Sequence, residues 1–235
     1  MELKCNDIHI YRINISDYNG SLLNLKKIMS EDETKKADRF KFTKDSQSYI
    51  TCRSLLRNIL SEYTNINPDE INFSCNESGK PYIENSEIQF NLSHSGDRCV
   101  IAVSLISETG VDIEKVRDIE DLTKIAERYF SETEIFYLKK FQGNELADNF
   151  FRIWTLKEAF IKATGEGLSF PLKDFSVTDR TGKIPVLSVI NTSAHLEKKW
   201  TLGFLENESG YVSSFAVNSE KIKIIYKTYP AEING

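Results

Sequence analysis

The chain of 235 residues contains the same order of expected elements twice. Up to residue 114 we expect short helices, a long helix and then strands, in order at 22–29, 30–42, 44–63, 71–75, 87–93, 99–105 and 110–114. The second half repeats this order, with helices at 121–130, 131–141 and 144–165 and strands at 174–179, 199–206, 211–217 and 221–229. The repeat predicts an α+β, pseudo-twofold duplicated fold of two similar halves, each a long helix packed on a small antiparallel sheet.

The boundary between the halves is placed between residues 108 and 109. The N-terminal half then covers 1–108 and the C-terminal half covers 109–235. Both lengths fall in the size range of small domains. Because ligand sites often lie between such halves, we expect the active site there.

Local signals support the helices of the first half. Ser30 is a good N-cap residue, and Glu33 three positions later completes a capping-box pattern. The segment 44–63 has apolar side chains at helical spacing, which predicts one buried stripe: Tyr49, Cys52, Leu55, Leu56, Ile59, Leu60 and Tyr63.

Composition excludes several classes of protein. The four cysteines have no CxxC pair and no histidine at ligand spacing, which argues against a zinc site or a disulfide framework and favours reduced thiols. A net charge of -5 disfavours nucleic acid as a partner. The N-terminus alternates polar and apolar residues and is not a signal peptide, and no run reaches the roughly 18 apolar residues of a membrane span. We expect a soluble cytoplasmic protein with no membrane partner.

The run Gly110-Val111-Asp112-Ile113-Glu114 is the most informative short motif. On a strand, Asp112 and Glu114 share one face while Val111 and Ile113 share the other. Adjacent carboxylates repel, and Mg²⁺ relieves that repulsion while binding one or two carboxylates together with substrate phosphates. A solvated, acidic strand end is the alternative.

The segment from Trp154 to Lys162 adds a third carboxylate. Glu158 and Lys162 are four residues apart on one helix face, with Lys157 beside them. An ordinary surface ion pair has the same spacing. The apolar residues around this polar face favour a helix that lines a cleft.

Ser93 and His94 belong to Asn91–Gly96, which is expected to end a strand in a polar turn. This turn is suited to bind a phosphate, although a structural histidine is an equal alternative. Neighbouring residues of a strand face opposite ways, so Ser93 and His94 do not form a catalytic pair, and no GxSxG motif is present.

Lys80 follows Gly79 in a turn. The first half also has a basic flank, a pattern that is commonly only a solvated face, with the members Lys35, Lys36, Arg39, Arg53 and Arg57.

Taken in order, GKP, FNLSHSG, GVDIE, WTLKEAFIK and GEGLSFPL resemble the signature of the 4′-phosphopantetheinyl transferase superfamily. The match runs from about Asp38 to Val177. The length of two halves resembles the surfactin-synthetase-activating (Sfp) type. The single-half holo-acyl-carrier-protein synthase branch, which forms trimers, fits less well.

This resemblance implies transfer of 4′-phosphopantetheine from coenzyme A to a serine of an apo acyl or peptidyl carrier protein, with release of 3′,5′-ADP. It implies Mg²⁺, with Mn²⁺ as an alternative, held by Asp112, Glu114 and Glu158. Glu158, Asp112 and Lys162 would form the catalytic set, with Glu158 accepting the serine proton directly or through a metal-bound water. Coenzyme A contacts are implied for Lys80, Ser93, His94, Lys157, Lys162 and Lys36. Glu134 is a weaker candidate, matching an acidic position of the family.

Some features stay open at this point. Glu33 stands where related proteins often carry a lysine, and the role of Tyr49 is undecided. The stretch 141–149 looks disordered and is a candidate rim for the carrier protein.

A Mg²⁺-dependent phosphodiesterase or pyrophosphatase, or a carrier-binding scaffold without catalysis, remains an alternative. The pathway, whether fatty-acid, polyketide or nonribosomal-peptide synthesis, is not specified by these motifs, and two fused halves predict a monomer.

Overall fold

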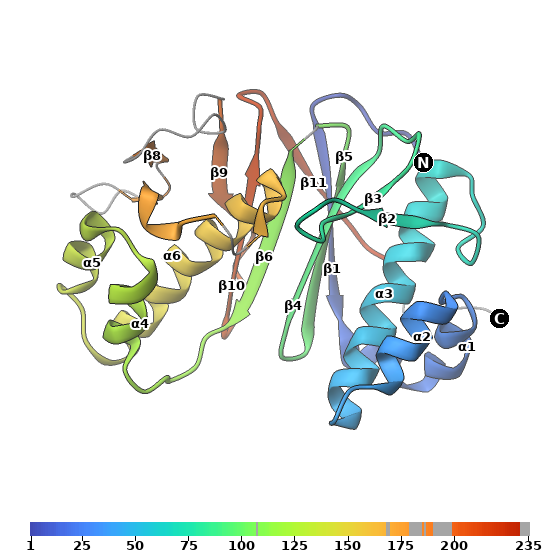
Figure 1. The fold of residues 1–235 in the computed structure, drawn as a ribbon, viewed down its shortest axis with the longest axis horizontal. Helices are drawn as coiled ribbons and strands as arrows, with labels where there is room; N and C mark the ends of the chain where they lie inside the picture. The colour runs from blue at the N-terminus through green and yellow to red at the C-terminus, as the bar shows by residue number, and fades with distance from the viewer. Residues whose placement is uncertain (107, 168–169, 179–184, 186, 190–198, 231–235) are drawn as a thin grey trace.

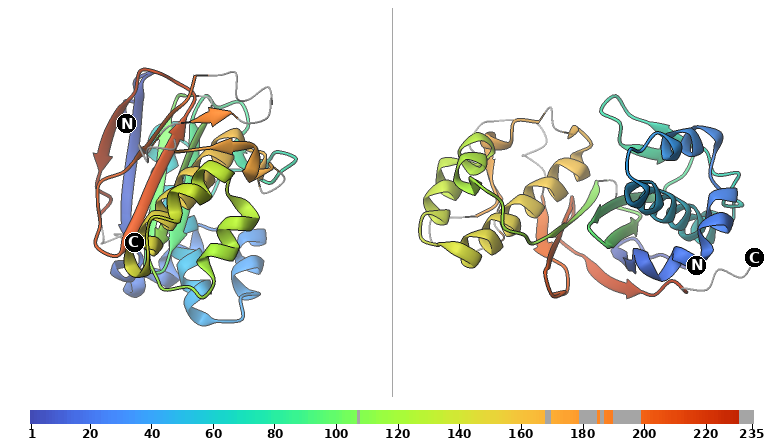
Figure 2. Two further views of the ribbon diagram at one scale, coloured as in Figure 1. Left: turned by 90° about the vertical axis from the view of Figure 1, so that its left-hand side faces the viewer. Right: turned by 90° about the horizontal axis from the view of Figure 1, so that it is seen from below.

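Strands lie in the middle of the molecule and helices flank them on both sides in the computed structural model (Figures 1 and 2). The structure describes residues 1–106, 108–167, 170–178, 185, 187–189 and 199–230. Leu168 and Ser169 of the GEGLSFPL motif lie outside the described residues. Within the described part of the chain, no helix combines the length and the apolar character needed to cross a membrane.

The first half contains the elements β1 (Asp7–Asn14), η1 (Ile15–Ser21), α1 (Leu22–Lys27), α2 (Glu31–Asp38), α3 (Thr43–Thr64), β2 (Phe73–Cys75), β3 (Pro81–Ile83), β4 (Gln89–Ser95) and β5 (Arg98–Ser104). The second half contains β6 (Thr109–Lys115), α4 (Leu122–Tyr129), α5 (Glu132–Leu138), α6 (Gly143–Thr164), η3 (Leu172–Asp174), β7 (Phe175–Ser176), β8 (Ser188–Val189), β9 (Thr201–Phe204), β10 (Tyr211–Val217) and β11 (Lys223–Lys227). The predicted α+β duplication is confirmed. Its two long helices, α3 and α6, each have 22 residues and end at a residue in the left-handed conformation.

The strands form two principal sheets. One has the order β11-β1-β5-β4 and the other has the order β6-β10-β9. β11 pairs in parallel with β1, so the segment 221–229 returns to the sheet of the first half. The sequence did not predict this crossing. Ile222 and Ile224 pack against the apolar core between the two sheets, which explains why β11 covers the free edge of β1.

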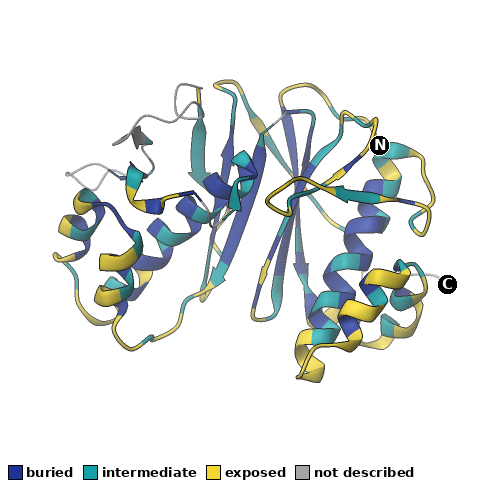
Figure 3. Ribbon diagram, viewed as in Figure 1, coloured by how far each residue is buried: buried dark blue, intermediate teal, exposed yellow. Residues whose placement is uncertain are grey.

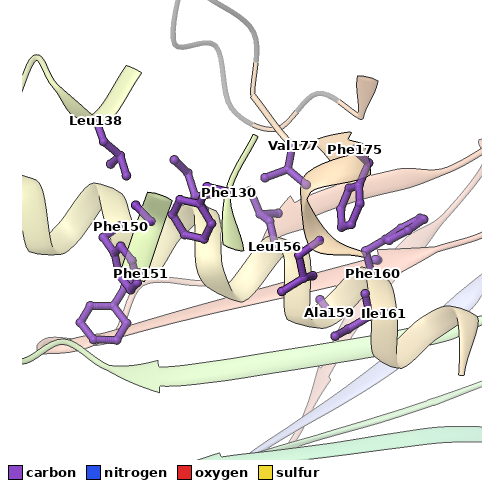
Figure 4. Close-up of a cluster of buried hydrophobic side chains, with 14 of the residues drawn as sticks. Phe130, Leu138, Phe150, Phe151, Leu156, Ala159, Phe160, Ile161, Phe175 and Val177 are labelled. Carbon is purple, nitrogen blue, oxygen red and sulfur yellow. The ribbon is translucent and has the colours of Figure 1, made fainter. Parts of the chain in front are cut away.

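Three apolar cores stabilise this arrangement. One surrounds α3 and a second surrounds α6, where Phe130, Phe150, Phe160 and Phe175 pack together (Figure 4). The third lies between the sheets and joins the halves, with members from both sheets: Ile8, Ile10, Val100, Ala102, Ile106, Val111, Ile113, Leu205, Phe215 and Val217. Figure 3 shows the resulting pattern, in which the sides of α3 and α6 that face the strands are buried. The apolar stripe predicted on 44–63 is therefore confirmed.

Each half contains an equivalent buried ion pair, which joins the capping-box glutamate of a short helix to a cation of the long helix. Ser30 and Glu33 form the predicted capping box of α2, and Glu33 accepts a hydrogen bond from Nε of Arg57 on α3 at 2.7 Å. In the second half, the Ser131 and Glu134 capping box of α5 presents Glu134 to Lys157 on α6, with 2.9 Å between Oε2 and Nζ. Each short helix is thereby attached to the long helix of its own half. Such pairs are costly to break because each partner is then left buried without its counter-charge.

All four cysteines are free thiols, with Cys52 and Cys99 buried and Cys5 and Cys75 exposed. This agrees with the expected absence of a disulfide framework.

Gly110 on β6 permits the close approach of β6 to α6. A Cβ atom at this position would overlap the carbonyl oxygen of Ala159 and lie 2.5 Å from the nitrogen of Ala163. We expect Gly110→Ala to lower the free energy of unfolding by about 3 kcal/mol, since backbone atoms cannot move aside as a flexible side chain can. Urea unfolding measures the change. Gly20→Ala is the matched control, because no atom lies within 4 Å of its added Cβ, and an equal effect of both substitutions would contradict the prediction.

Candidate active site

A cavity of about 920 Å³ lies between the halves and collects most of the predicted site residues. β4 contributes Ser93 and His94, β6 contributes Asp112 and Glu114, and α6 contributes Glu158 and Lys162. The remaining lining residues are Arg128, Tyr129, Trp154, Phe170, Pro171, Leu172, Lys173 and Asp174.

Side chains, and not a shared sheet, connect β4 to β6. Alternate residues of β4 from Asn91 to Ser95 bond to β6, and the first of these bonds joins the amide of Val111 to Asn91 Oδ1 at 2.9 Å. Ser93 Oγ donates to Asp112 Oδ1 at 2.7 Å, and Ser95 Oγ donates to Glu114 Oε2 at 2.6 Å. This β4–β6 seam orients both carboxylates of the GVDIE motif. The predicted alternation is confirmed, because Val111 and Ile113 on the other face are buried in the core between the sheets.

Lys162 adds a positive charge to the seam. Its Nζ lies 2.6 Å from Asp112 Oδ1 and 2.9 Å from Ser93 Oγ. The other oxygen of Asp112, Oδ2, and Oε1 of Glu158 are both buried and accept no hydrogen bond from the described residues. Buried polar atoms are normally satisfied, so two unsatisfied carboxylate oxygens in one cavity indicate that a donor or cation belongs there.

Two carboxyl groups in the cavity, those of Glu158 and Glu114, have raised pKa values. Burial, followed by the charge of Asp112, raises the pKa of Glu158 to about 7, and Lys162 only partly opposes this. Burial also raises the pKa of Glu114, with the hydrogen bond from Ser95 opposing it. Lys162 therefore offsets only part of the effect of burial and of neighbouring carboxylates on Glu114 and Glu158.

The ligand set predicted for Mg²⁺ is only partly pre-arranged. Asp112, Glu114 and Glu158 line one cavity, and their hard oxygen atoms suit a divalent cation that keeps water and phosphate ligands. However, no three His, Cys, Asp or Glu side chains among the described residues converge closely enough to form a metal cluster. Asp112 Oδ1 is instead occupied by Ser93 and Lys162. The unsatisfied oxygens of Asp112 and Glu158 fit the proposed ion, while the metal site itself stays a prediction.

Lys157 requires a correction. It was predicted to contact coenzyme A phosphates, but its Nζ is buried and donates to the carbonyls of Leu172 and Phe175, each at 2.7 Å. Its counter-charge is Glu134, which is also fully buried. Both residues therefore stabilise the fold of the second half and do not line the cavity. One helix position separates Lys157 from Glu158, which turns the two side chains about 100° apart.

His94 and Ser93 lie on β4 itself, and the polar turn begins only at Gly96. The strand predicted at 87–93 therefore includes Ser93 as expected and continues to Ser95, which places His94 on the strand as well. Burial by surrounding protein and the nearby charge of Lys162 lower the pKa of His94, although its side chain is exposed at the mouth of the cavity. A neutral imidazole at this position retains one hydrogen-bond donor. The phosphate contact predicted for His94 stays a prediction.

The lysines predicted to hold the nucleotide end of coenzyme A lie outside the main cavity. Lys80 lines a smaller adjoining cavity of about 210 Å³, together with Asn91 and Lys162. Its ammonium group donates to the carbonyls of Thr109 and Ala163, and its contact with the nucleotide end of coenzyme A stays a prediction. Lys36 is exposed on α2, with its Nζ 5.2 Å from the centre of the Tyr49 ring, and lines neither cavity.

Two other expectations are resolved by the structure. Glu33, which departs from the family pattern, is buried in the ion pairs with Arg53 and Arg57. The stretch 141–149 is not disordered, because α6 begins at Gly143 and Phe141 packs against the core of the second half.

Sequence reasoning missed the aromatic wall of the cavity. Tyr129 and Trp154 pack edge to face with their ring centres 5.8 Å apart, and Arg128 lies over the Tyr129 ring. Trp154 lies one helical turn before Glu158, so its spacing was a usable signal. Tyr129 had no such signal, because only the tertiary fold brings α4 beside α6.

Comparisons with known proteins identify the family of this chain. A sequence model of the 4′-phosphopantetheinyl transferase superfamily matches residues 108–216, and a model of the 4′-phosphopantetheinyl transferase N-terminal region matches residues 18–106. The chain is 33% identical over 173 residues to the 4′-phosphopantetheinyl transferase HetI of Nostoc sp., covering 72% of this chain and 73% of HetI. It is 38% identical over 150 residues to Sfp of Bacillus subtilis, covering 63% of this chain and 66% of Sfp. A solved holo-(acyl-carrier-protein) synthase of Bacillus anthracis, in complex with CoA (3′,5′-ADP), is 28% identical with a TM-score of 0.39 and covers 48% of this chain and 95% of that one.

Glu158 should make the stability of the metal-free protein depend on pH. Its pKa is raised from 4.5 to about 7, so the folded state holds this proton more tightly than the unfolded state does. The free energy of unfolding contributed by Glu158 therefore falls as pH rises from about 4.5 to about 7. We expect Glu158→Gln to be more stable than the wild type by about 1 to 3 kcal/mol at pH 8, with a smaller difference at pH 4.

Urea unfolding with a chelator present, at both pH values, measures this difference. Glu145→Gln, an exposed position on the same helix, is the control. A stability difference that does not change with pH would contradict the assignment.

Proposed function

The chain belongs to the 4′-phosphopantetheinyl transferase superfamily and is an enzyme of that class, and from this we propose how its cavity performs the transfer. The 4′-phosphopantetheine group moves from coenzyme A to a serine of an apo acyl or peptidyl carrier protein. One observation carries the assignment of this reaction to the cavity: Asp112, Glu114, Glu158 and Lys162 line the same cavity between the halves, and buried oxygens of Asp112 and Glu158 are left unsatisfied.

Mg²⁺ is the proposed cofactor, with Mn²⁺ as an alternative. Asp112, Glu114 and Glu158 are the residues that would hold it. When bound, the ion would offset the charge of the pyrophosphate of coenzyme A. Lys162 supports the same task, because its ammonium group is fixed beside Asp112 at the cavity wall.

The residues of the chain supply the proton transfer and the orientation. The serine Oγ attacks the phosphorus attached to the pantetheine arm, the bond from that phosphorus to the bridging oxygen breaks, and 3′,5′-ADP leaves. The serine proton passes to Glu158, whose carboxylate lines the cavity together with Asp112 and Lys162. His94 and Lys162 are proposed to hold phosphate oxygens, and Ser93 fixes both Lys162 and Asp112.

The aromatic side of the cavity is proposed to receive the pantetheine arm. Tyr129 and Trp154 offer apolar surface there, and Arg128 is exposed beside them. A basic rim is suited to an acidic carrier protein. The cytoplasmic location and the monomeric state remain part of the proposal.

The decisive experiment is the intact mass of a purified apo carrier protein after incubation with this chain, coenzyme A and Mg²⁺, compared with a chelated control. We expect a gain of about 340 Da, the mass of one phosphopantetheine, only when the metal ion is present. Coenzyme A consumption without a mass gain across acyl and peptidyl carriers would favour a phosphodiesterase or pyrophosphatase. Neither consumption nor gain would indicate a scaffold.

Asp112→Asn keeps the shape of the side chain but removes the charge shared by Lys162 and the proposed cation. We expect the transfer rate to fall at least about 100-fold, because electrostatic stabilisation of the transferring phosphoryl group depends on that charge balance. Thermal unfolding should confirm a folded variant, and Glu145→Gln is the control for general effects of a lost carboxylate. Unchanged turnover of Asp112→Asn would remove Asp112 from the mechanism.

A further inference from the structure

The turn between β2 and β3 is closed by its own side chain. Asn76 Oδ1 accepts the amides of Ser78 and Lys80, at 3.1 and 2.8 Å. The backbone of Asn76 also bonds to Lys80 and Gly79, and Gly79 adopts a φ of +86°, which favours glycine. These hydrogen bonds within the turn hold its shape independently of its contacts with the rest of the molecule.

This turn, which belongs to the first half, caps the end of α6 in the second half. Lys80 Nζ donates to the carbonyl of Ala163 at 2.8 Å, and Asn76 Nδ2 donates to the carbonyl of Gly165 at 2.8 Å. The last carbonyls of a helix lack partners within the helix and carry its partial negative charge. Here Lys80 supplies both a hydrogen-bond donor and a positive charge, and the Asn76 side chain supplies a second donor.

Lys80 also contacts the strand that carries the carboxylates. Its Nζ donates to the carbonyl of Thr109 at 3.2 Å, at the start of β6. One ammonium group thus joins the β2–β3 turn, the first residue of β6 and the last turn of α6. Asp112 lies three residues beyond Thr109, and Lys162 directly precedes Ala163.

The contact leaves little freedom at this junction. Gly165 has a φ of +75°, and a Cβ there would lie 2.9 Å from Asn76 Nδ2 and 3.1 Å from Lys80 Cδ. Burial lowers the pKa of Lys80 to about 8, as expected for an ammonium group enclosed by protein.

We propose that Lys80 is a positioning residue: with Asn76 it clamps the end of α6 and the start of β6 to the first half, and thereby fixes Lys162 and Glu158 against Ser93 and Asp112. This inference rests on the proposed transfer reaction. It replaces the nucleotide contact expected for the Lys80 side chain from the sequence.

Hydrogen exchange of the unliganded protein tests the clamp without any chemistry. Lys80→Met and Asn76→Ala should each speed exchange of the amides at the end of α6 and at the start of β6. Lys80→Arg retains donors for the two carbonyls and should stay close to the wild type. Lys35→Met, at an exposed surface pair, is the control. Unchanged exchange in both Lys80→Met and Asn76→Ala would overturn the proposal, and Asn76→Ala keeps it testable should Lys80→Met not fold.

Steady-state transfer separates positioning from nucleotide binding. We expect kcat to fall about 10- to 100-fold in Lys80→Met, with KM for coenzyme A within about twofold and with recovery in Lys80→Arg. The preference for coenzyme A over 3′-dephospho-coenzyme A should be unchanged. A raised KM at constant kcat, or loss of that preference, would make Lys80 a nucleotide ligand and overturn the proposal. Absence of transfer by the wild type would defeat the proposed function, while the exchange measurement would still decide the clamp.

Discussion

The hydrogen bonds from alternate residues of β4 to β6 are the constraint on which the site depends. Backbone pairing would have merged the two strands into one sheet and used their polar groups in a ladder. Asn91, Ser93 and Ser95 instead connect the strands through side chains, and two of these three contacts go directly to carboxylates. The seam therefore holds the halves together and fixes Asp112 and Glu114 with the same bonds. A short hydroxyl is suited to this role because it can donate to a carboxylate and accept an amide, as Ser95 does with Glu114 and Lys115.

The two halves differ at a few positions of their long helices, and α6 is the long helix that lines the described cavity. The buried cation of each long helix is retained, as Arg57 in α3 and Lys157 in α6. One residue further along, α6 has Glu158 where α3 has Asn58, and Tyr63 occupies the helix position that Ala163 occupies in α6. The hydroxyl group of Tyr63 is hydrogen-bonded to His9 and Tyr11, so at this position of α3 the polar groups bond to other side chains of the first half. The first half contributes Ser93 and His94 of β4 to the cavity.

Periodicity and capping signals were sufficient to predict much of this architecture, because they depend on neighbours in the sequence. The Ser30–Glu33 capping box, the apolar stripe of α3 and the shared face of Asp112 and Glu114 are all local features. The roles of Lys157 and Lys80 were not accessible in this way. Both lysines occur beside motif residues, yet each is paired with groups distant in the chain, Glu134 in one case and the carbonyls of Thr109 and Ala163 in the other. The parallel pairing of β11 with β1 is equally long-range.

Charge balance in the cavity supplies the physical argument for the proposed cation. Asp112, Glu114 and Glu158 share the cavity with Lys162, whose ammonium group is paired with Asp112, and burial has already raised the pKa values of Glu114 and Glu158. Coenzyme A would bring further negative charge in its pyrophosphate to the same place. Protonating the carboxyl groups would reduce the repulsion, but it would also remove the base that accepts the serine proton. A divalent cation reduces the repulsion while leaving Glu158 ionised, and the unsatisfied oxygens of Asp112 and Glu158 are the atoms available to it.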